Sequence, residues 1–129
     1  MSATDSPPAA RPTVLVVDDE APVRGVLRLG LDPLFDVEEA RSANEAELMM
    51  ATRHYDVIVC DHIMPDEEGL PFLMRARKLF PKTQRILLTG YVNPELLSRS
   101  TELAGLAGCV MKPVNAVELA EAINFALPR

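Results

Sequence analysis

The sequence lacks three features that mark membrane, secreted and disulfide-rich proteins. No run of 18 or more apolar residues is present, so we expect no helix that crosses a bilayer. Only two cysteines occur, Cys60 and Cys109, and both lie within apolar runs, which argues against a disulfide framework or a cysteine zinc site. Residues 1–12 lack the basic start and apolar centre of a signal peptide. We therefore expect a cytoplasmic protein that does not bind membranes.

Basic residues are also scarce, with 13 Lys and Arg against 19 Asp and Glu and a net charge of -6. This balance argues against direct nucleic-acid binding by this domain, because such surfaces concentrate cations against phosphate. The charge is unevenly placed: residues 1–70 carry 15 acidic and 5 basic side chains (-10), and residues 71–129 carry 4 and 8 (+4). The basic stretch of the second half predicts a solvated helix face and loop; it comprises Arg75, Arg77, Lys78, Lys82 and Arg85.

Four short apolar runs stand out, at residues 14–17, 57–60, 86–88 and 109–111, with a weaker fifth candidate at 35–40. The first four are continuous and do not alternate with polar residues, which is typical of strands buried on both faces of a parallel sheet. The mixed polarity of the fifth candidate suits the edge of a sheet.

Segments with helical periodicity separate these runs, and we expect helices at 22–34, 42–53, 70–79, 93–106 and 115–127. Ser42 with Glu45 and Asn115 with Glu118 have the spacing of capping boxes at helix starts. Strands and helices thus alternate five times. This order predicts one flavodoxin-like (βα)5 domain: a five-stranded parallel sheet of order 2-1-3-4-5 with helices on both faces. We place this domain at residues 13–129, after a flexible tail over residues 1–12.

Ligands bind beyond the carboxyl ends of the strands in such sheets. Five polar residues directly follow the apolar runs: Asp18, Asp19, Asp61, Thr89 and Lys112. Carboxylates within about 4–6 Å of one another repel unless a cation intervenes, and Mg²⁺ prefers oxygen ligands of this kind. The carboxylates, the ammonium of Lys112 and the hydroxyl of Thr89 together suit a phosphoryl group. One of the carboxylates could itself be the nucleophile.

These residues resemble the response-regulator receiver domains of two-component signalling, the chemotaxis-regulator type. The resemblance covers about residues 13–127. Four motifs carry it: Val-Leu-Val-Val-Asp-Asp-Glu at 14–20, Val-Ile-Val-Cys-Asp-His-Ile-Met-Pro-Asp-Glu-Glu-Gly at 57–69, Leu-Leu-Thr-Gly at 87–90 and Val-Met-Lys-Pro at 110–113. Together they are highly specific.

The resemblance implies that Asp61 is the phosphoacceptor, which attacks the phosphorus of a phosphohistidine. It implies that Asp19 and Asp61 hold Mg²⁺ directly, that the main-chain carbonyl of Ile63 adds a ligand, and that Asp18 acts through water.

Further implications concern the groups around the phosphoryl site. Lys112 is expected to pair with Asp61 and then with a phosphoryl oxygen, and Thr89 to bond another phosphoryl oxygen. Pro65 and Gly69 match loop positions of the family, and the Lys112-Pro113 bond matches a peptide bond that is cis in the family.

One departure concerns signal transmission. The family usually has Tyr or Phe three residues before the lysine, whereas this chain has Cys109, which we interpret as a core thiol. A second hypothesis is that Tyr91 and Ile63 flank the phosphoryl site and slow its hydrolysis.

Two other functions stay open. One is a binding module that no longer uses phosphorylation. The other is a Mg²⁺-dependent phosphatase with an aspartyl nucleophile. Such enzymes need a second acid two residues after the nucleophile, and this chain has Ile63 there, which disfavours this function. The leading hypothesis is a receiver that turns over no separate metabolite. Its partners would be a sensor histidine kinase or histidine phosphotransfer protein and an effector, either separate or C-terminal to residue 129. Homodimer formation is left open.

Overall fold

The computed structural model describes residues 11–90 and 94–128, so most of the expected tail, Tyr91 and Asn93 lie outside the described ranges. Ten elements alternate along the chain: β1 (Thr13–Val17), α2 (Ala21–Leu31), β2 (Asp36–Ala40), α3 (Ala43–Thr52), β3 (Val57–Asp61), α4 (Gly69–Leu79), β4 (Gln84–Thr89), α5 (Pro94–Ala104), β5 (Gly108–Met111) and α6 (Ala116–Ala126). None of the helices in these ranges is long and apolar enough to cross a membrane.

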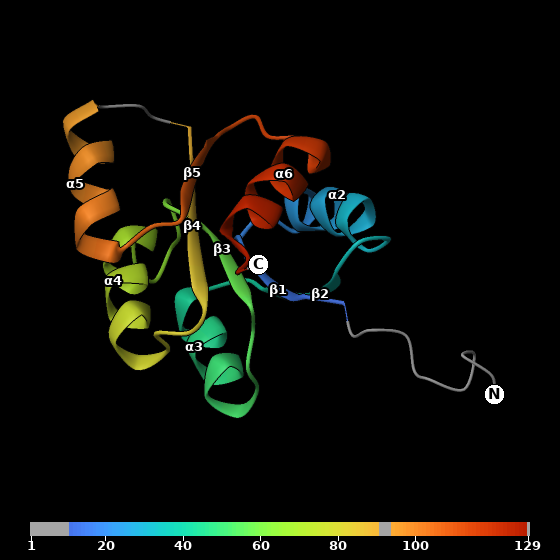
Figure 1. Ribbon diagram of the computed structural model, residues 1–129, viewed down its shortest axis with the longest axis horizontal. Coiled ribbons are helices and arrows are strands. Elements are labelled where there is room, and N and C mark those ends of the chain that lie inside the picture. Colours follow the sequence, from blue (N-terminus) through green and yellow to red (C-terminus); the bar gives the residue numbers. More distant parts are fainter. Residues whose placement is uncertain (1–10, 91–93, 129) are drawn as a thin grey trace.

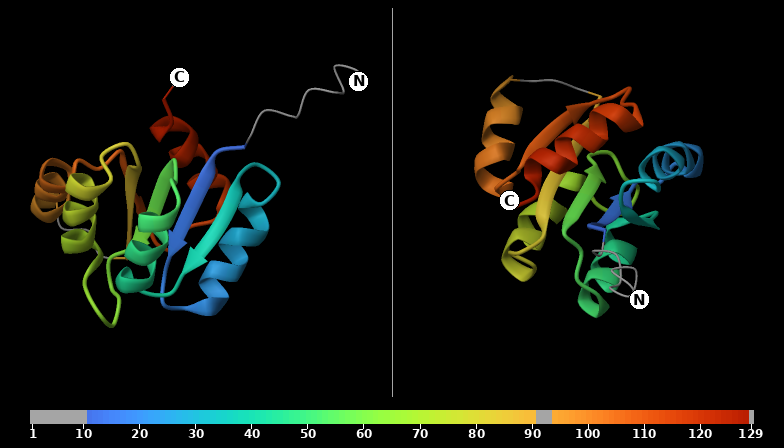
Figure 2. Two further views of the ribbon diagram at one scale, coloured as in Figure 1. Left: turned by 90° about the horizontal axis from the view of Figure 1, so that it is seen from below. Right: turned by 45° about the vertical axis from the view of Figure 1, so that its right-hand side comes forward.

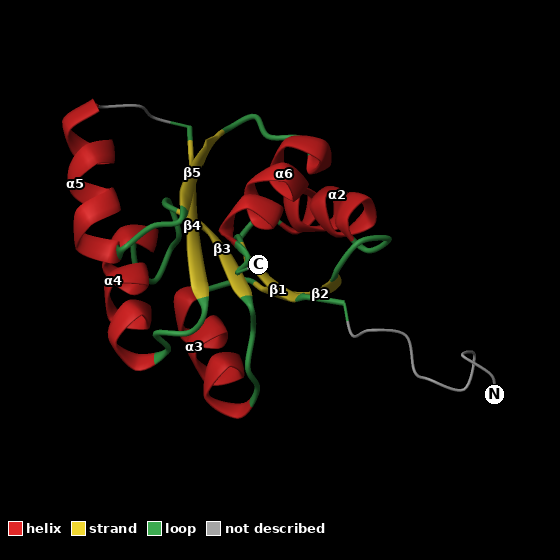
Figure 3. Ribbon diagram, viewed as in Figure 1, coloured by secondary structure: helices red, strands yellow, loops and turns green. Residues whose placement is uncertain are grey.

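The five strands form one parallel sheet of order β2-β1-β3-β4-β5, as predicted (Figures 1 and 3). Neighbouring strands are in a register that brings their last residues to one edge. Val17 pairs with Cys60, Asp61 with Leu88, and Thr89 with Met111. The residues at the carboxyl ends of four strands therefore lie along one edge of the sheet.

Two hydrophobic cores lie on opposite faces of the sheet. Alternate residues of β1 point to different cores: Val14 and Val16 pack with side chains of α2 and α6, and Leu15 and Val17 with side chains of α3 and α4. Figure 2 shows the same two layers of helices from other directions. Because both faces are covered, the interior strands contain continuous apolar runs.

Two helices end two or three residues earlier than the sequence predicts. The first expected helix, 22–34, stops at Leu31, because Pro33 has no N–H to donate to a helical carbonyl. The fourth, expected to reach Leu106, ends at Ala104, because Gly105 has a φ of 57°, in the left-handed region that terminates helices. The expected caps are confirmed, since the side chains of Ser42 and Asn115 accept hydrogen bonds from main-chain N–H groups three residues later.

Arg85 corrects the prediction of a solvated basic stretch. It lies within β4 and is buried, and its guanidinium donates to the carbonyl oxygens of Ala104 at 2.8 Å and Gly105 at 3.1 Å. Burial lowers the pKa of Arg85. The side chain thus satisfies carbonyls at the C-terminal end of α5, a role that charge patterning along the sequence does not reveal.

Gly30 in α2 lies against Ala116 in α6, where a Cβ on Gly30 would lie 2.2 Å from the Cβ of Ala116. We expect Gly30→Ala to lower the free energy of unfolding by about 1–3 kcal/mol, because the two helices must separate. Gly25→Ala, in the same helix with no atom within 4 Å, is the matched control and should raise it by about 0.5–1 kcal/mol. Urea denaturation measures both, and equal tolerance at the two positions would contradict this packing.

Candidate functional site

The polar residues predicted to cluster do follow the ends of their strands. Asp18 and Asp19 follow β1, Asp61 ends β3, and Lys112 follows β5. Asp18 is fully buried and Asp61 is 4% exposed, whereas Asp19 is exposed. Two of the carboxylates therefore lie inside the edge of the sheet and one faces outward.

Lys112 joins the two buried carboxylates. Its Nζ lies 3.2 Å from Oδ2 of Asp18 and 3.2 Å from Oδ1 of Asp61. Burial opposes its charge, yet the two carboxylates raise the pKa of Lys112. The ammonium is therefore fully charged at neutral pH and lies between two negative groups.

The single positive charge of Lys112 does not fully compensate the negative charges of Asp61 and Asp18. Burial and the neighbouring Asp18 raise the pKa of Asp61, and the opposing effects of Lys112 and of a hydrogen bond from the Ile63 main chain do not cancel them. The ionised form of Asp61 is thus held at a cost that an added cation would relieve.

A fourth acidic side chain, Glu20, extends the cluster beyond the predicted set. Carboxylate oxygens of Asp18, Asp19 and Glu20 all lie within 4.8 Å of one another. The main-chain N–H of Glu20 also donates to Oδ1 of Asp18 at 2.9 Å. Glu20 directly follows Asp18 and Asp19 in the sequence, but an acidic residue at that position is equally typical of a solvated loop.

The chemistry of these donors fits a divalent metal ion. Carboxylate oxygens are the ligands that hard cations prefer, and the excess of negative over positive charge attracts one. The structure does not place Asp61 in the compact group of Asp18, Asp19 and Glu20; Lys112 links it to that group instead.

Two further predicted residues lie near Asp61: Thr89 on the neighbouring strand β4, and Ile63 in the loop that follows β3. Thr89 ends β4 and is buried, and its carbonyl accepts from the N–H of Lys112 at 2.9 Å. Ile63, two residues after Asp61, is 68% exposed. The loop after β3 therefore presents an exposed apolar side chain beside the buried carboxylate.

Gly69 lets α4 begin directly against the end of β3. A Cβ at this position would lie 2.3 Å from the carbonyl oxygen of Asp61 and 2.9 Å from the Cα of His62, distances that a side chain does not tolerate. The N–H of Gly69 donates to the carbonyl of His62 at 2.7 Å. The Lys112-Pro113 peptide bond is cis, as expected.

The loop between β3 and α4 is anchored to α3. Asp66 accepts hydrogen bonds from the main-chain N–H groups of Ala43 at 3.3 Å and Asn44 at 3.0 Å. Although burial opposes ionisation, these bonds lower the pKa of Asp66. A carboxylate at the N-terminus of a helix is favourable, and here it fixes the loop that carries Ile63.

Cys109 lies in β5, half-buried and packed against the core on the α3 and α4 face. Burial raises the pKa of its thiol. The prediction of a core thiol is confirmed, and the position holds no aromatic ring.

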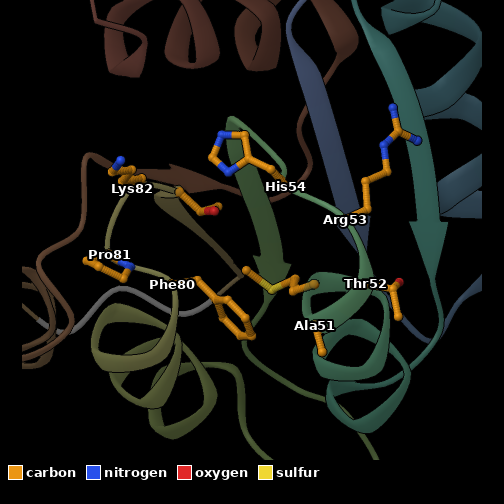
Figure 4. A pocket seen from close by; sticks show the side chains of 9 residues that line it. Ala51, Thr52, Arg53, His54, Phe80, Pro81 and Lys82 are labelled. Atoms are coloured by element: carbon orange, nitrogen blue, oxygen red, sulfur yellow. The ribbon is translucent and has the colours of Figure 1, made fainter.

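A separate crevice of about 470 Å³ lies at the opposite edge of the sheet, between the end of α3 and the loop before β4. Figure 4 shows the side chains of His54 and Phe80 on either side of it. The guanidinium of Arg53, at its rim, is paired with Asp36 at 2.8 Å. This crevice is remote from the carboxylates and is not part of the site.

Solved structures place this arrangement in the class of CheY-like receiver domains. The chemotaxis protein CheY4 of Vibrio cholerae superposes with a TM-score of 0.84 at 29% identity, covering 92% of this chain and all (100%) of that one. The receiver domain of an HD domain-containing protein from Pseudomonas fluorescens gives 0.83 at 29% identity, covering 90% and 94% of the two chains.

The family model of the response regulator receiver domain matches residues 14–124, and the chain belongs to this family. The hydrogenase transcriptional regulatory protein HoxA of Cupriavidus necator is 38% identical over 101 residues, which cover 78% of this chain and 21% of that protein. The DNA-binding transcriptional activator DevR/DosR of Mycobacterium tuberculosis is 35% identical over 86% of this chain and 52% of its own length. The chain thus spans about a fifth to a half of these relatives.

The raised pKa of Asp61 predicts that Asp61→Asn stabilises the metal-free protein at pH 7.5. The amide keeps the shape without the charge, and Lys112 retains Asp18 as a partner. We expect a melting temperature higher by a few degrees in EDTA, since about 1 kcal/mol corresponds to several degrees in a domain of this size.

The sign of the pH dependence follows from the direction of the shift. Because the folded carboxyl has the higher pKa, the stability of the wild type falls as pH rises through that pKa, and the difference from Asp61→Asn vanishes near the ordinary Asp value of about 3.9. Melting curves between pH 4 and 8 test this, with Asp19→Asn, at an exposed carboxylate, as the control. A destabilised Asp61→Asn at pH 7.5 would contradict the charge balance described for the site.

Proposed function

We propose that this receiver domain accepts a phosphoryl group on Asp61 from a phosphohistidine of a sensor histidine kinase or a histidine phosphotransfer protein. The supporting observation is the position of Lys112, within 3.2 Å of both Asp61 and Asp18 at the carboxyl edge of the sheet. Phosphorylation would change the affinity of the domain for a downstream effector. The domain would catalyse its own phosphorylation and the slow hydrolysis of its phosphoryl group. It would turn over no separate metabolite.

In the transfer step, a carboxylate oxygen of Asp61 forms a bond to phosphorus as the bond from phosphorus to the histidine nitrogen breaks. The electron pair of that bond stays on the imidazole, which leaves neutral once it takes up a proton. The donor would approach past the partly exposed Lys112 and the exposed Ile63, the two groups between the buried Asp61 and solvent. Asp61 must be ionised for the attack, so groups that stabilise its charge also prepare the nucleophile.

Lys112 and Thr89 act on the phosphoryl oxygens. The ammonium that pairs with Asp61 before transfer is close enough to pair with a phosphoryl oxygen afterwards, and it thereby neutralises charge that develops during the transfer. The hydroxyl of Thr89, at the end of the adjacent strand, would donate a hydrogen bond to another phosphoryl oxygen.

The oxygen ligands around Asp61 are suited to Mg²⁺. Asp19 and Asp61 would hold it directly, the Ile63 carbonyl would add a ligand, and Asp18 would act through water. The structure adds Glu20 as a neighbouring acid. When bound, the ion would neutralise carboxylate and phosphoryl charge, which lets the otherwise repelling groups come together.

An apolar crevice beside the site suits the phosphodonor. It has a volume of about 540 Å³ between α2 and the segment after β5, and residues including Val23, Val26, Pro113 and Val114 line it together with Lys112. Val26 is 66% exposed. A donor with an apolar surface that covers this crevice would bring its phosphohistidine next to Lys112.

Incubation with Mg²⁺ and acetyl phosphate, followed by the mass of the intact chain, tests the proposal. We expect a gain of one phosphoryl group per chain, lost in Asp61→Ala and abolished by EDTA. Continued release of phosphate from small phosphate esters would instead indicate a phosphatase, and an unchanged mass would indicate a binding module. Labelling that persists in Asp61→Ala would refute the assignment of the phosphoacceptor.

A further inference from the structure

Given the magnesium site proposed above, we infer that Arg24 is a positioning residue for the metal ion. It would act through the main chain of Asp18 and restrain where the Asp19 carboxylate can lie. Arg24 lies in the first two turns of α2, and its side chain is 15% exposed.

The guanidinium of Arg24 makes two contacts that tie the acidic loop, residues 18–20, to the sheet. Its Nη1 donates to the carbonyl oxygen of Asp18 at 2.6 Å, and its Nε donates to Oε1 of Glu39 in β2 at 3.1 Å. The guanidinium is planar and has several donors in a fixed geometry, so one group can hold both acceptors at once.

Asp18 is fixed at each of its polar groups. Its N–H donates to the carbonyl of Ala40 at 3.1 Å, and its carboxylate accepts from the N–H of Glu20 and from Lys112. The contact from Arg24 holds the remaining group, the carbonyl. Arg24 therefore completes the restraint of the residue that precedes Asp19.

The carbonyl of Asp18 and the N–H of Asp19 belong to one planar peptide unit. A fixed carbonyl therefore fixes the position of the Asp19 Cα, which lies in the same plane. The carboxylate of Asp19 is exposed, and in the ranges 11–90 and 94–128 no side chain donates a hydrogen bond to it. The main chain is thus the restraint on where this carboxylate can lie, and Arg24 holds that main chain.

Arg28 supplies a matched control one turn further along α2. Its Nη1 donates to the other oxygen of Glu39 at 3.1 Å, and its Nε lies 3.7 Å from Asp32, so it shares Glu39 with Arg24 without contacting Asp18. Replacing Arg24 therefore removes the contact to Asp18 while Arg28 still links α2 to β2.

Titration of the full chain with Mg²⁺ by calorimetry tests the inference. We expect Arg24→Met to raise the Kd for Mg²⁺ about tenfold or more, which is the usual effect of removing a group that orients a metal ligand. Arg24→Lys should recover part of the affinity, because an ammonium can donate to the carbonyl but does not hold Glu39 in the same planar geometry. Arg28→Met should bind Mg²⁺ within about twofold of the wild type.

A second readout separates positioning from a general loss of structure. With acetyl phosphate as donor, the rate of Asp61 phosphorylation at saturating Mg²⁺ should fall less in Arg24→Met than the affinity for Mg²⁺ does, and the melting temperatures of Arg24→Met and Arg28→Met in EDTA should be similar. Mg²⁺ affinity of Arg24→Met within twofold of the wild type, or an equal loss in Arg28→Met, would overturn the inference alone. A wild-type chain that does not bind Mg²⁺ would contradict the proposed function as well.

Discussion

The repulsion between carboxylates at the carboxyl edge of the sheet is the constraint on which the rest of the site depends. Asp18 and Asp61 are buried close enough that one raises the pKa of the other, and Lys112 compensates both with a single charge. This excess of negative charge favours binding of a cation. It also leaves Asp61 as a carboxylate that can both bind a metal ion and form a bond to a phosphoryl group. Metal binding and nucleophilicity thus have one electrostatic origin.

The fold maintains this unfavourable arrangement with contacts that lie outside the reacting groups. Gly69 allows α4 to start against Asp61, Asp66 attaches the following loop to α3, and Arg24 attaches the acidic loop to β2. Each contact uses a main-chain group or a partly buried ion pair. Free energy gained in the scaffold therefore offsets the repulsion between carboxylates at the site.

The sheet and the positions of the acids could be predicted from sequence because both follow from local patterns. Continuous apolar runs identify buried parallel strands, and residues that follow such runs must meet at one edge. The ends of α2 and α5 were misplaced because Pro33 and Gly105 override helical periodicity. The burial of Arg85 and the bridging contacts of Arg24 escaped prediction because they join residues far apart in the chain, and charge patterning contains no signal for them.

Reduction of the phosphorylated chain with borohydride, followed by peptide sequencing by mass spectrometry, identifies the residue that carries the phosphoryl group. Borohydride converts an aspartyl phosphate to homoserine and leaves free carboxylates unchanged. After treatment with acetyl phosphate and Mg²⁺, we expect homoserine at position 61 and aspartate at positions 18 and 19. Homoserine at position 18 or 19, or at none of the three, would contradict this expectation.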